Sequence, residues 1–240
     1  MEKEIVNAAL IVIGDEILSG RTEDKNINYI AKNLSSIGIN LCEVRVIGDL
    51  KEEISQTIIN LSNKYDYVFT SGGIGPTHDD ITSESVASAF NVDLELNKEA
   101  ERILHDHYGV EINEARLKMA KIPKGAKLLD NPISSAPGFR IKNVFVMAGI
   151  PEIFQAMFNA AKKELHGGRE TKSKEITINL TESVIAKDLE LLQKKYPQVI
   201  MGSYPFKGGT SLVFRSKKYE DLETSYQEMV AILDIIKNNR

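Results

Sequence analysis

The sequence is poor in cysteine, histidine and long apolar runs. It has one cysteine, Cys42, and four histidines in 240 residues. A single thiol cannot form an intrachain disulfide or build a cysteine-based metal site, and it fits a reducing cytoplasm. The longest apolar run near the start, Ala8–Ile13, is too short for a signal-peptide core or a membrane helix. We therefore expect a cytoplasmic protein with no membrane partner.

The chain also lacks an excess of positive charge. Thirty Lys and Arg residues against 34 Asp and Glu residues give a net charge of −4. This balance argues against a dedicated nucleic-acid binder, which must neutralise many phosphates. With 42% apolar and 27% charged residues, the composition is that of an ordinary globular protein. The length predicts one large domain or two modest ones.

Apolar residues are arranged in strand-like and helix-like patterns that alternate along the first two thirds of the chain. Strand patterns occur at 8–13, 41–47, 66–70 and 143–148, with two short extended pieces at 131–132 and 137–138. Helix patterns occur at 26–37, 51–63, 82–90, 98–107 and 150–165. This alternation predicts a doubly wound α/β domain with a mostly parallel sheet.

The last third of the chain predicts a second, smaller domain. Residues 166–174 contain two glycines and several charges without apolar periodicity, so we expect a linker there. Beyond it the pattern is strand, helix, strand, strand, helix, which favours a three-stranded sheet covered by two helices. The expected domains are residues 1–168 and residues 174–240.

The most informative segment is the glycine-rich stretch 70–82, between a predicted strand and a predicted helix. Its glycines allow close backbone approach, and amide groups ahead of a helix N-terminus can cradle phosphate. Asp79 and Asp80 next to the cradle could hold a divalent cation or position a water. Alternatively, the glycines form only a tight turn and an acid or Thr82 caps the helix. The segment matches neither the Walker P-loop nor the Rossmann fingerprint.

A second polar segment, 14–26, also lies between a predicted strand and a predicted helix. Ligands of open parallel sheets bind beyond the carboxyl ends of the strands, so both segments should border one crevice. Asp15, Glu16 and Asp24 thereby become candidates, as does Asp49 after the second strand. Helix capping explains Asp24 and Asp49 equally well.

Arg116 lies in a basic stretch that could neutralise a substrate phosphate. The alternative is a solvated helix face. No Gly-x-x-Gly loop of the kind that clamps RNA backbone follows the first helix of the small domain, which further argues against a nucleic-acid partner.

Two segments together resemble a known family. Gly-Asp-Glu-Ile-Leu-Ser-Gly at 14–20 with Asp-Lys-Asn at 24–26, and Ser-Gly-Gly-Ile-Gly-Pro-Thr-His-Asp-Asp-Ile-Thr at 71–82, are similar to the paired signatures of the competence/damage-inducible protein A (CinA) family. Shorter similar pieces lie at 121–126, 131–139 and 148–152, and the last third resembles the small KH-like domain that follows in such proteins. The resemblance implies a short form of the family, without its C-terminal deamidase domain.

This resemblance implies a three-layer α/β/α domain of the molybdopterin-binding (MoaB/MogA-like, MoCF) type that binds a nucleotide or pterin phosphate. Carried over position by position, the implied phosphate-binding residues are Gly72, Gly73, Gly75, Pro76, Thr77 and Asn26. The implied catalytic and metal-binding acids are Asp24, Asp79 and Asp80, with a divalent ion such as Mg, Mn or Co. The substrate-binding candidates are Asp15, Glu16, Asp49, Arg116, Asn131, Pro137 and Gly138.

Two functional hypotheses follow. The first is a metal-dependent pyrophosphatase acting on ADP-ribose or FAD-like dinucleotides. The second is a protein that binds or adenylylates molybdopterin, with nucleotide sensing as a third, weaker alternative. Because relatives of this fold assemble, we also expect a closed homo-oligomer. This chain departs from the family at the rim of the pocket. Many relatives have glycine in place of Ser134 or Ser135 and glutamine in place of Met119, and these differences leave the choice of substrate open.

Overall fold

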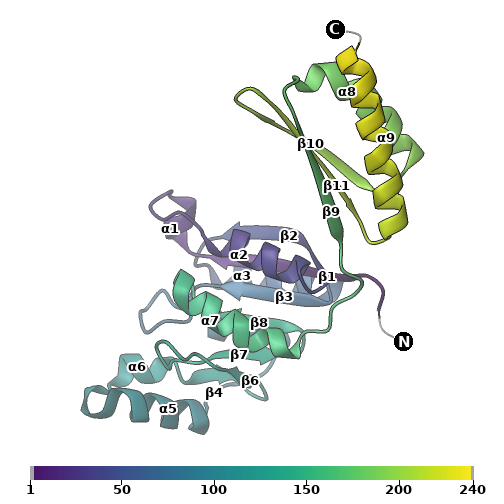
Figure 1. Ribbon diagram of the computed structural model, residues 1–240. Coiled ribbons are helices and arrows are strands. Elements are labelled where there is room, and N and C mark those ends of the chain that lie inside the picture. Colours follow the sequence, from purple (N-terminus) through teal and green to yellow (C-terminus); the bar gives the residue numbers. More distant parts are fainter. Residues whose placement is uncertain (1–2, 239–240) are drawn as a thin grey trace. The chain divides into compact units, whose positions relative to one another are not determined.

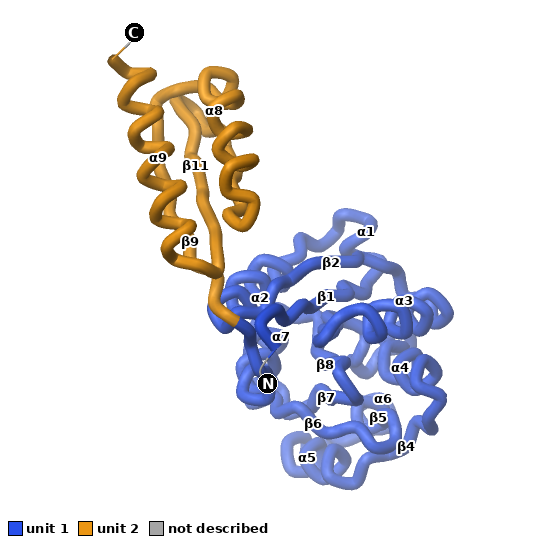
Figure 2. The backbone as a smooth tube through the Cα atoms, turned by 90° about the vertical axis from the view of Figure 1, so that its right-hand side faces the viewer, with its two compact units in different colours: residues 1–168 blue, residues 169–240 orange. Residues whose placement is uncertain are grey.

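The computed structural model describes residues 3–238. The chain divides into two compact units, residues 1–168 and residues 169–240, which Figure 2 distinguishes by colour. Each unit has its own hydrophobic core. In the described part of the chain, no helix combines the length and apolar character needed to cross a membrane.

Unit 1 is built on a six-stranded sheet with the order β2-β1-β3-β8-β7-β6 (Figure 1). The first four strands in this order run parallel, whereas β7 is antiparallel to β8 and β6 to β7. The expected mostly parallel α/β fold is thereby confirmed. The strands are β1 (Val6–Ile13), β2 (Ile39–Ile47), β3 (Tyr67–Ser71), β6 (Lys127–Leu129), β7 (Gly138–Ile141) and β8 (Val144–Met147).

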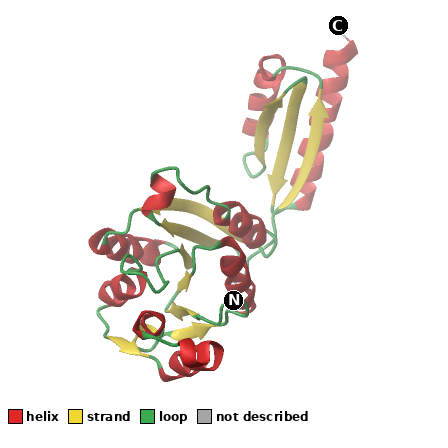
Figure 3. Cartoon of the chain, turned by 90° about the vertical axis from the view of Figure 1, so that its left-hand side faces the viewer, coloured by secondary structure: helices red, strands yellow, loops and turns green. Residues whose placement is uncertain are grey.

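Helices cover both faces of this sheet, which gives unit 1 three layers (Figure 3). Leu10 and Val12 of β1 pack on the face covered by α2 (Asn26–Ser35) and α7 (Pro151–Ala161). Ile11 and Ile13 point to the other face, covered by α3 (Lys51–Lys64) and α4 (Thr82–Phe90). Because this central strand is buried on both faces, its sequence from Ala8 to Ile13 is continuously apolar rather than alternating.

A small excursion leaves the sheet after α4 and returns before β6. It contains β4 (Leu94–Leu96), α5 (Lys98–Tyr108), the 3-10 turn η1 (Gly109–Glu111), α6 (Glu114–Lys118) and β5 (Lys121–Pro123). The strands β4 and β5 pair with each other in antiparallel fashion. Of these elements the sequence predicted only α5. The short helix α1 (Asp15–Leu18) and the 3-10 turn η2 (Lys162–Glu164) after α7 were also not predicted.

One expected extended piece is instead a turn. Asn131 is followed by turn residues, and its side-chain oxygen accepts the N–H groups of Ile133 and Ser134 at 3.2 and 3.3 Å. Its amide nitrogen donates to the Ser134 hydroxyl and to the Ala136 carbonyl oxygen. An asparagine that bonds to the backbone two residues ahead closes the chain on itself, so the prediction of extended structure at 131–132 was wrong.

Unit 2 has the predicted order of elements. Its antiparallel sheet β10-β11-β9 packs against two helices, through a core that includes Ile185, Leu212, Phe214 and Met229. The elements are β9 (Lys172–Ile178), α8 (Glu182–Lys195), β10 (Ile200–Phe206), β11 (Gly209–Ser216) and α9 (Tyr219–Asn238). The strand β9 begins inside the expected linker, because its first residues pair with β11 while their side chains remain largely exposed and polar.

Candidate functional site

A hollow of about 920 Å³ opens at the carboxyl edge of the parallel strands of unit 1. Its walls come from the loops after β1, β2, β3 and β8, from the turn after β6, and from the α5–α6 excursion. This volume lies in the upper part of the range typical for small-molecule sites. The expected crevice shared by the two sequence segments is therefore present at the edge where parallel sheets bind ligands.

The glycine-rich loop forms the floor of the hollow. Gly72 has a φ of 111°, and a Cβ at this position would lie 2.2 Å from the Ile13 carbonyl oxygen. Gly73 has a φ of 69°, and a Cβ there would lie 2.2 Å from the Thr82 hydroxyl oxygen. Any side chain at either position would collide with the structure around it, so glycine is required by close approach as well as by conformation.

Three consecutive amides of this loop have no hydrogen-bond acceptor. Gly72 N–H is used by the Met147 carbonyl oxygen, but within residues 3–238 the N–H groups of Gly73, Ile74 and Gly75 have no partner. All three residues line the hollow. Successive free amide groups in a concave loop form an anion-binding cradle, so this loop has the donors that a phosphate group requires.

The N-terminus of α7 supplies further donors beside the glycine-rich loop. Gly149, Ile150 and Pro151 line the hollow, and no side chain caps the helix. The Gly149 and Ile150 N–H groups likewise have no acceptor among the described residues. An uncapped helix start carries partial positive charge, so it adds to the attraction for an anion.

Asp79 and Asp80 both line the hollow, but their surroundings differ. Asp80 accepts hydrogen bonds from the Thr77 backbone N–H at 2.8 Å and from the Thr77 hydroxyl, and thereby shapes the loop. The Asp79 side chain is 62% exposed. The Thr77 hydroxyl nearby, with smaller effects of His78 and Lys118, lowers the pKa of Asp79, which therefore remains ionised.

Negative charge is crowded beside the cradle. Asp49 lines the hollow together with Glu16 and accepts the Asp15 N–H at 3.0 Å. Burial raises the pKa of Asp49 despite that hydrogen bond, and the carboxylates of Asp15, Glu16 and Asp79 raise it further. A bound cation would relieve this repulsion. Among residues 3–238, however, no three His, Cys, Asp or Glu side chains are arranged as a metal-binding group.

Asp24 and Asn26 are not among the described lining residues of the hollow. Asp24 accepts the Ile27 N–H at 2.8 Å, which corresponds to the helix-capping alternative. The Asn26 side chain is buried and donates to the Ser71 hydroxyl and the Gly149 carbonyl oxygen, both at 2.8 Å. Asn26 therefore joins the end of β3 to the loop before α7 and connects the two segments that carry the free amides.

The remaining predicted residues divide into two groups. The lining of the hollow includes Arg116, Asn131, Gly75 and Pro76, although all the hydrogen-bonding capacity of the Asn131 side chain is used within its own turn. Four other predicted residues are not part of the described lining: Asp15, Thr77, Pro137 and Gly138. Pro137 and Gly138 are buried beside it.

Several lining residues of the hollow were missed, among them Arg21 and Thr22. The helix start at Gly149–Pro151 was also missed as part of the site, although a proline shortly after a buried strand and a glycine marks the first turn of a helix. Tyr108 at the end of α5 also lines the hollow. No sequence signal distinguishes Tyr108 from an ordinary partly buried aromatic residue.

Comparisons with known proteins agree with this fold. Residues 9–167 match the family described as the probable molybdopterin binding domain, and residues 170–239 match the middle domain of FAD synthase. A CinA protein of unknown function from Thermoplasma acidophilum is 34% identical, with a TM-score of 0.64 over 67% of this chain and 99% of that one. The chain therefore belongs to the molybdopterin-binding-domain family, with CinA as a structural relative.

Relatives of two lengths are known. A protein of Archaeoglobus fulgidus is 31% identical over 225 residues, which cover 94% of this chain and 97% of the relative. The probable FAD synthase of Caenorhabditis elegans is 34% identical over 260 residues, which cover 93% of this chain. The chain spans about half the length of that nematode protein, since the match covers 50% of it.

Proposed function

We propose that this protein is a divalent-metal-dependent pyrophosphohydrolase that cleaves nucleotide phosphoanhydrides, with ADP-ribose or FAD-like dinucleotides as substrates. The observation that carries the proposal is the run of three unpaired amides at Gly73–Gly75 in a hollow bordered by carboxylates. The amides can neutralise the charge that develops on phosphoryl oxygens, and preorganised donors of this kind are a major source of catalysis.

The relatives support the choice of substrate. This chain combines, in one order, segments similar to a molybdopterin-binding domain and to the middle domain of FAD synthase, and its match to the nematode FAD synthase extends over both. A dinucleotide with a flavin or adenosine half therefore agrees with what these relatives are named for. Hydrolysis would yield two monophosphates.

The chemistry of the donors suits a hard cation. Magnesium is usually held by one or two carboxylates together with substrate phosphates and water, so a protein site with fewer than three acids is sufficient. Asp79 and Asp80 would hold the ion, with Asp49 near enough to interact electrostatically with Asp79. When bound, a divalent ion polarises phosphoryl oxygens and makes a water more acidic.

The protein's own groups have separate tasks in this proposal. The Gly73–Gly75 amides bind one phosphoryl group, and the Gly149 and Ile150 amides of the neighbouring loop bind the other. Asp80 keeps the loop in shape through Thr77. Asn26 fixes the spacing between the two sets of amides, because it is bonded to both supporting segments.

A second candidate is binding or adenylylation of molybdopterin. It is favoured by the family match over residues 9–167, and it would use the same cradle for the pterin phosphate. Under this alternative the protein binds molybdopterin tightly and leaves dinucleotides intact.

The test is a chromatographic assay of ADP-ribose, FAD, NAD and ATP with Mg, Mn, Co or Ni ions, with Asp80→Asn as the inactive comparison. Formation of AMP together with ribose 5-phosphate or FMN, lost in the variant, supports the hydrolase. If no substrate is cleaved with any ion, the hydrolase is excluded, and titration with molybdopterin decides the second candidate.

A further inference from the structure

The α5–α6 excursion contributes an aromatic ring, a guanidinium group and a thioether side chain to the lining of the hollow. Tyr108, Arg116 and Met119 all line it. The Arg116 guanidinium carbon lies 4.1 Å from the centre of the Tyr108 ring, a stacked cation–π arrangement. None of these groups is needed for the phosphate cradle described above.

Neighbouring residues hold this pair in place. Tyr108 and Met119 pack against the small core of the excursion formed by Ala100, Leu104 and Ala120. The Arg116 Nη1 atom donates to the Glu111 carbonyl oxygen and to its carboxylate, the latter at 3.3 Å. A guanidinium fixed at one end and stacked on a ring keeps a defined plane, which a stacking surface requires.

The excursion is also tied to the cradle. The Lys118 ammonium group donates a hydrogen bond to the Thr77 carbonyl oxygen, which joins α6 to the glycine-rich loop. The stacking surface and the phosphate donors therefore border one cavity, and a ligand with a ring at one end and phosphate at the other can contact both.

We propose that Tyr108, Arg116 and Met119 form a subsite for the planar heteroaromatic ring of the ligand, with its phosphate at the Gly73–Gly75 amides. This inference rests on the proposed function for the position of the phosphates. The Arg116 charge is already partly neutralised by Glu111, whereas the Gly73–Gly75 amides have no acceptor among residues 3–238. Base stacking on aromatic and guanidinium planes tolerates different rings, so a purine and a flavin share the necessary chemistry.

Binding without metal separates this subsite from hydrolysis. The ligands are FMN, AMP and ribose 5-phosphate, which carry a flavin ring, a purine ring and no aromatic ring on comparable monophosphates. Flavin emission reports FMN binding, and calorimetry reports the other two. We expect FMN or AMP to bind at least about tenfold more tightly than ribose 5-phosphate. Tight binding of one ring alone identifies which half of a dinucleotide occupies the subsite.

Variants test the residues. Tyr108→Leu and Arg116→Lys should each weaken the ring-bearing ligand about tenfold and leave ribose 5-phosphate unchanged. Tyr108→Phe should restore most of the affinity, because it keeps the ring. Arg102→Lys, on α5 of the same excursion and paired with Glu99 and Asp106, is the matched control for the arginine change.

Any one of three results overturns the subsite. The wild type could bind ribose 5-phosphate as tightly as FMN and AMP, or it could bind neither FMN nor AMP. The third result is that Tyr108→Leu and Arg116→Lys, with circular dichroism spectra that match the wild type, both keep the wild-type affinity for the ring-bearing ligand. An equal loss of ribose 5-phosphate binding in Arg116→Lys would assign Arg116 to phosphate instead. Ring preference with no dinucleotide cleavage would leave the subsite intact and exclude only the hydrolase.

Discussion

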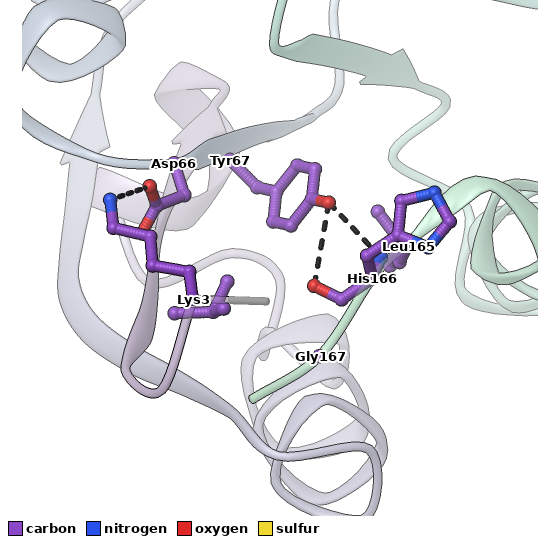
Figure 4. Close-up of a pocket in the computed structure, with 7 residues that line it drawn as sticks. Lys3, Asp66, Tyr67, Leu165, His166 and Gly167 are labelled. Atoms are coloured by element: carbon purple, nitrogen blue, oxygen red, sulfur yellow. Dashed lines mark hydrogen bonds and ion pairs between the residues drawn. The ribbon is translucent and has the colours of Figure 1, made fainter. Parts of the chain in front are cut away.

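The sheet of unit 1 has a hollow at each edge, and the two differ in how their polar groups are satisfied. At the amino edge, a hollow of about 520 Å³ is lined by residues that include Lys3, Asp66, Tyr67 and His166 (Figure 4). Lys3 pairs with Asp66, which also accepts the Asn7 N–H at 2.8 Å. The Tyr67 hydroxyl accepts the His166 N–H at 3.0 Å.

At the carboxyl edge some groups are paired, as Asp80 is with Thr77 and Arg116 with Glu111, but others are not. Three loop amides lack acceptors within residues 3–238, and Asp49 is surrounded by other carboxylates that raise its pKa. Buried or half-buried polar groups are normally satisfied, so exceptions need an explanation. A hollow alone is therefore not sufficient to indicate a ligand-binding site. Unpaired hydrogen-bond donors and crowded carboxylates within a hollow are the stronger indication. The following variants test this difference.

The largest expected effect is on folding of the cradle. In Gly72→Ala the new Cβ meets the Ile13 carbonyl oxygen, and the backbone must also keep a φ of 111°. We expect a loss of roughly 3 to 5 kcal/mol in the free energy of unfolding. Gly125→Ala is the control, because Gly125 has a φ of 80° but open space around it, and should cost only about 1 to 2 kcal/mol. Urea denaturation measures both, and equal losses would show that close approach at Gly72 is unimportant.

The next effect concerns catalysis. Asp80 holds the Thr77 backbone N–H and Asp79 does not, so Asp79→Asn disturbs the loop less than a change at Asp80. If the hydrolase proposal holds, kcat/KM for dinucleotide cleavage should fall about 100-fold. Asp66→Asn removes a carboxylate at the amino edge and should leave kcat/KM unchanged. Equal losses in both variants would contradict the assignment of chemistry to the carboxyl edge.

The sequence predicted features that are local along the chain. The uniformly apolar strand β1 and the amphipathic α2 were found because each element buries a continuous face. The glycine-rich loop and its two acids were found because strand, loop and helix follow one another directly. By contrast, β4 and β5 have three residues each, and Leu94 and Leu96 of β4 are exposed, so no apolar period exists to detect.

Contacts between distant residues explain what could not be predicted. Asn26 reaches Gly149 across 123 positions of sequence, and this bond gives the implied phosphate ligand a supporting role between two loops. Tyr108 lines the hollow only because the excursion folds back beside the loop, to which Lys118 is bonded. Neither relation leaves a local pattern in the sequence.

A smaller effect is expected at the amino edge itself. Tyr67→Phe removes the hydroxyl that accepts the His166 N–H, and a typical hydrogen bond contributes about 1 kcal/mol. We expect a loss of that size in the free energy of unfolding and no change in ligand binding at the other edge. Differential scanning calorimetry and FMN titration measure the two quantities. Weaker FMN binding in this variant would contradict the separation of the two edges.

The finest comparison is between a carboxylate in the middle of β2 and one just beyond its end. Glu43 lies within β2 and Asp49 two residues beyond its end. Hydrogen bonds from Lys64, Tyr65 and Arg45 lower the pKa of Glu43 from 4.5 to about 2. The pKa of Asp49 is raised instead, by burial and by its acidic neighbours. The surroundings of Glu43 favour its ionised form, whereas the surroundings of Asp49 favour its protonated form.

These opposite shifts have opposite consequences for stability. Ionised Glu43 stabilises the folded state above pH 4.5, and this contribution is lost as the pH falls from 4.5 toward 2. Because Asp49 binds its proton more tightly when folded, its ionisation at neutral pH destabilises the protein. At pH 7 we therefore expect Glu43→Gln to lower the free energy of unfolding by about 1 kcal/mol or less, since the group is partly exposed, and Asp49→Asn to raise it. Urea denaturation at pH 3, 5 and 7 measures both changes. A loss of stability in Asp49→Asn would mean that favourable interactions already offset the repulsion among the acids beside the cradle. The electrostatic reason for a cation there would then be removed.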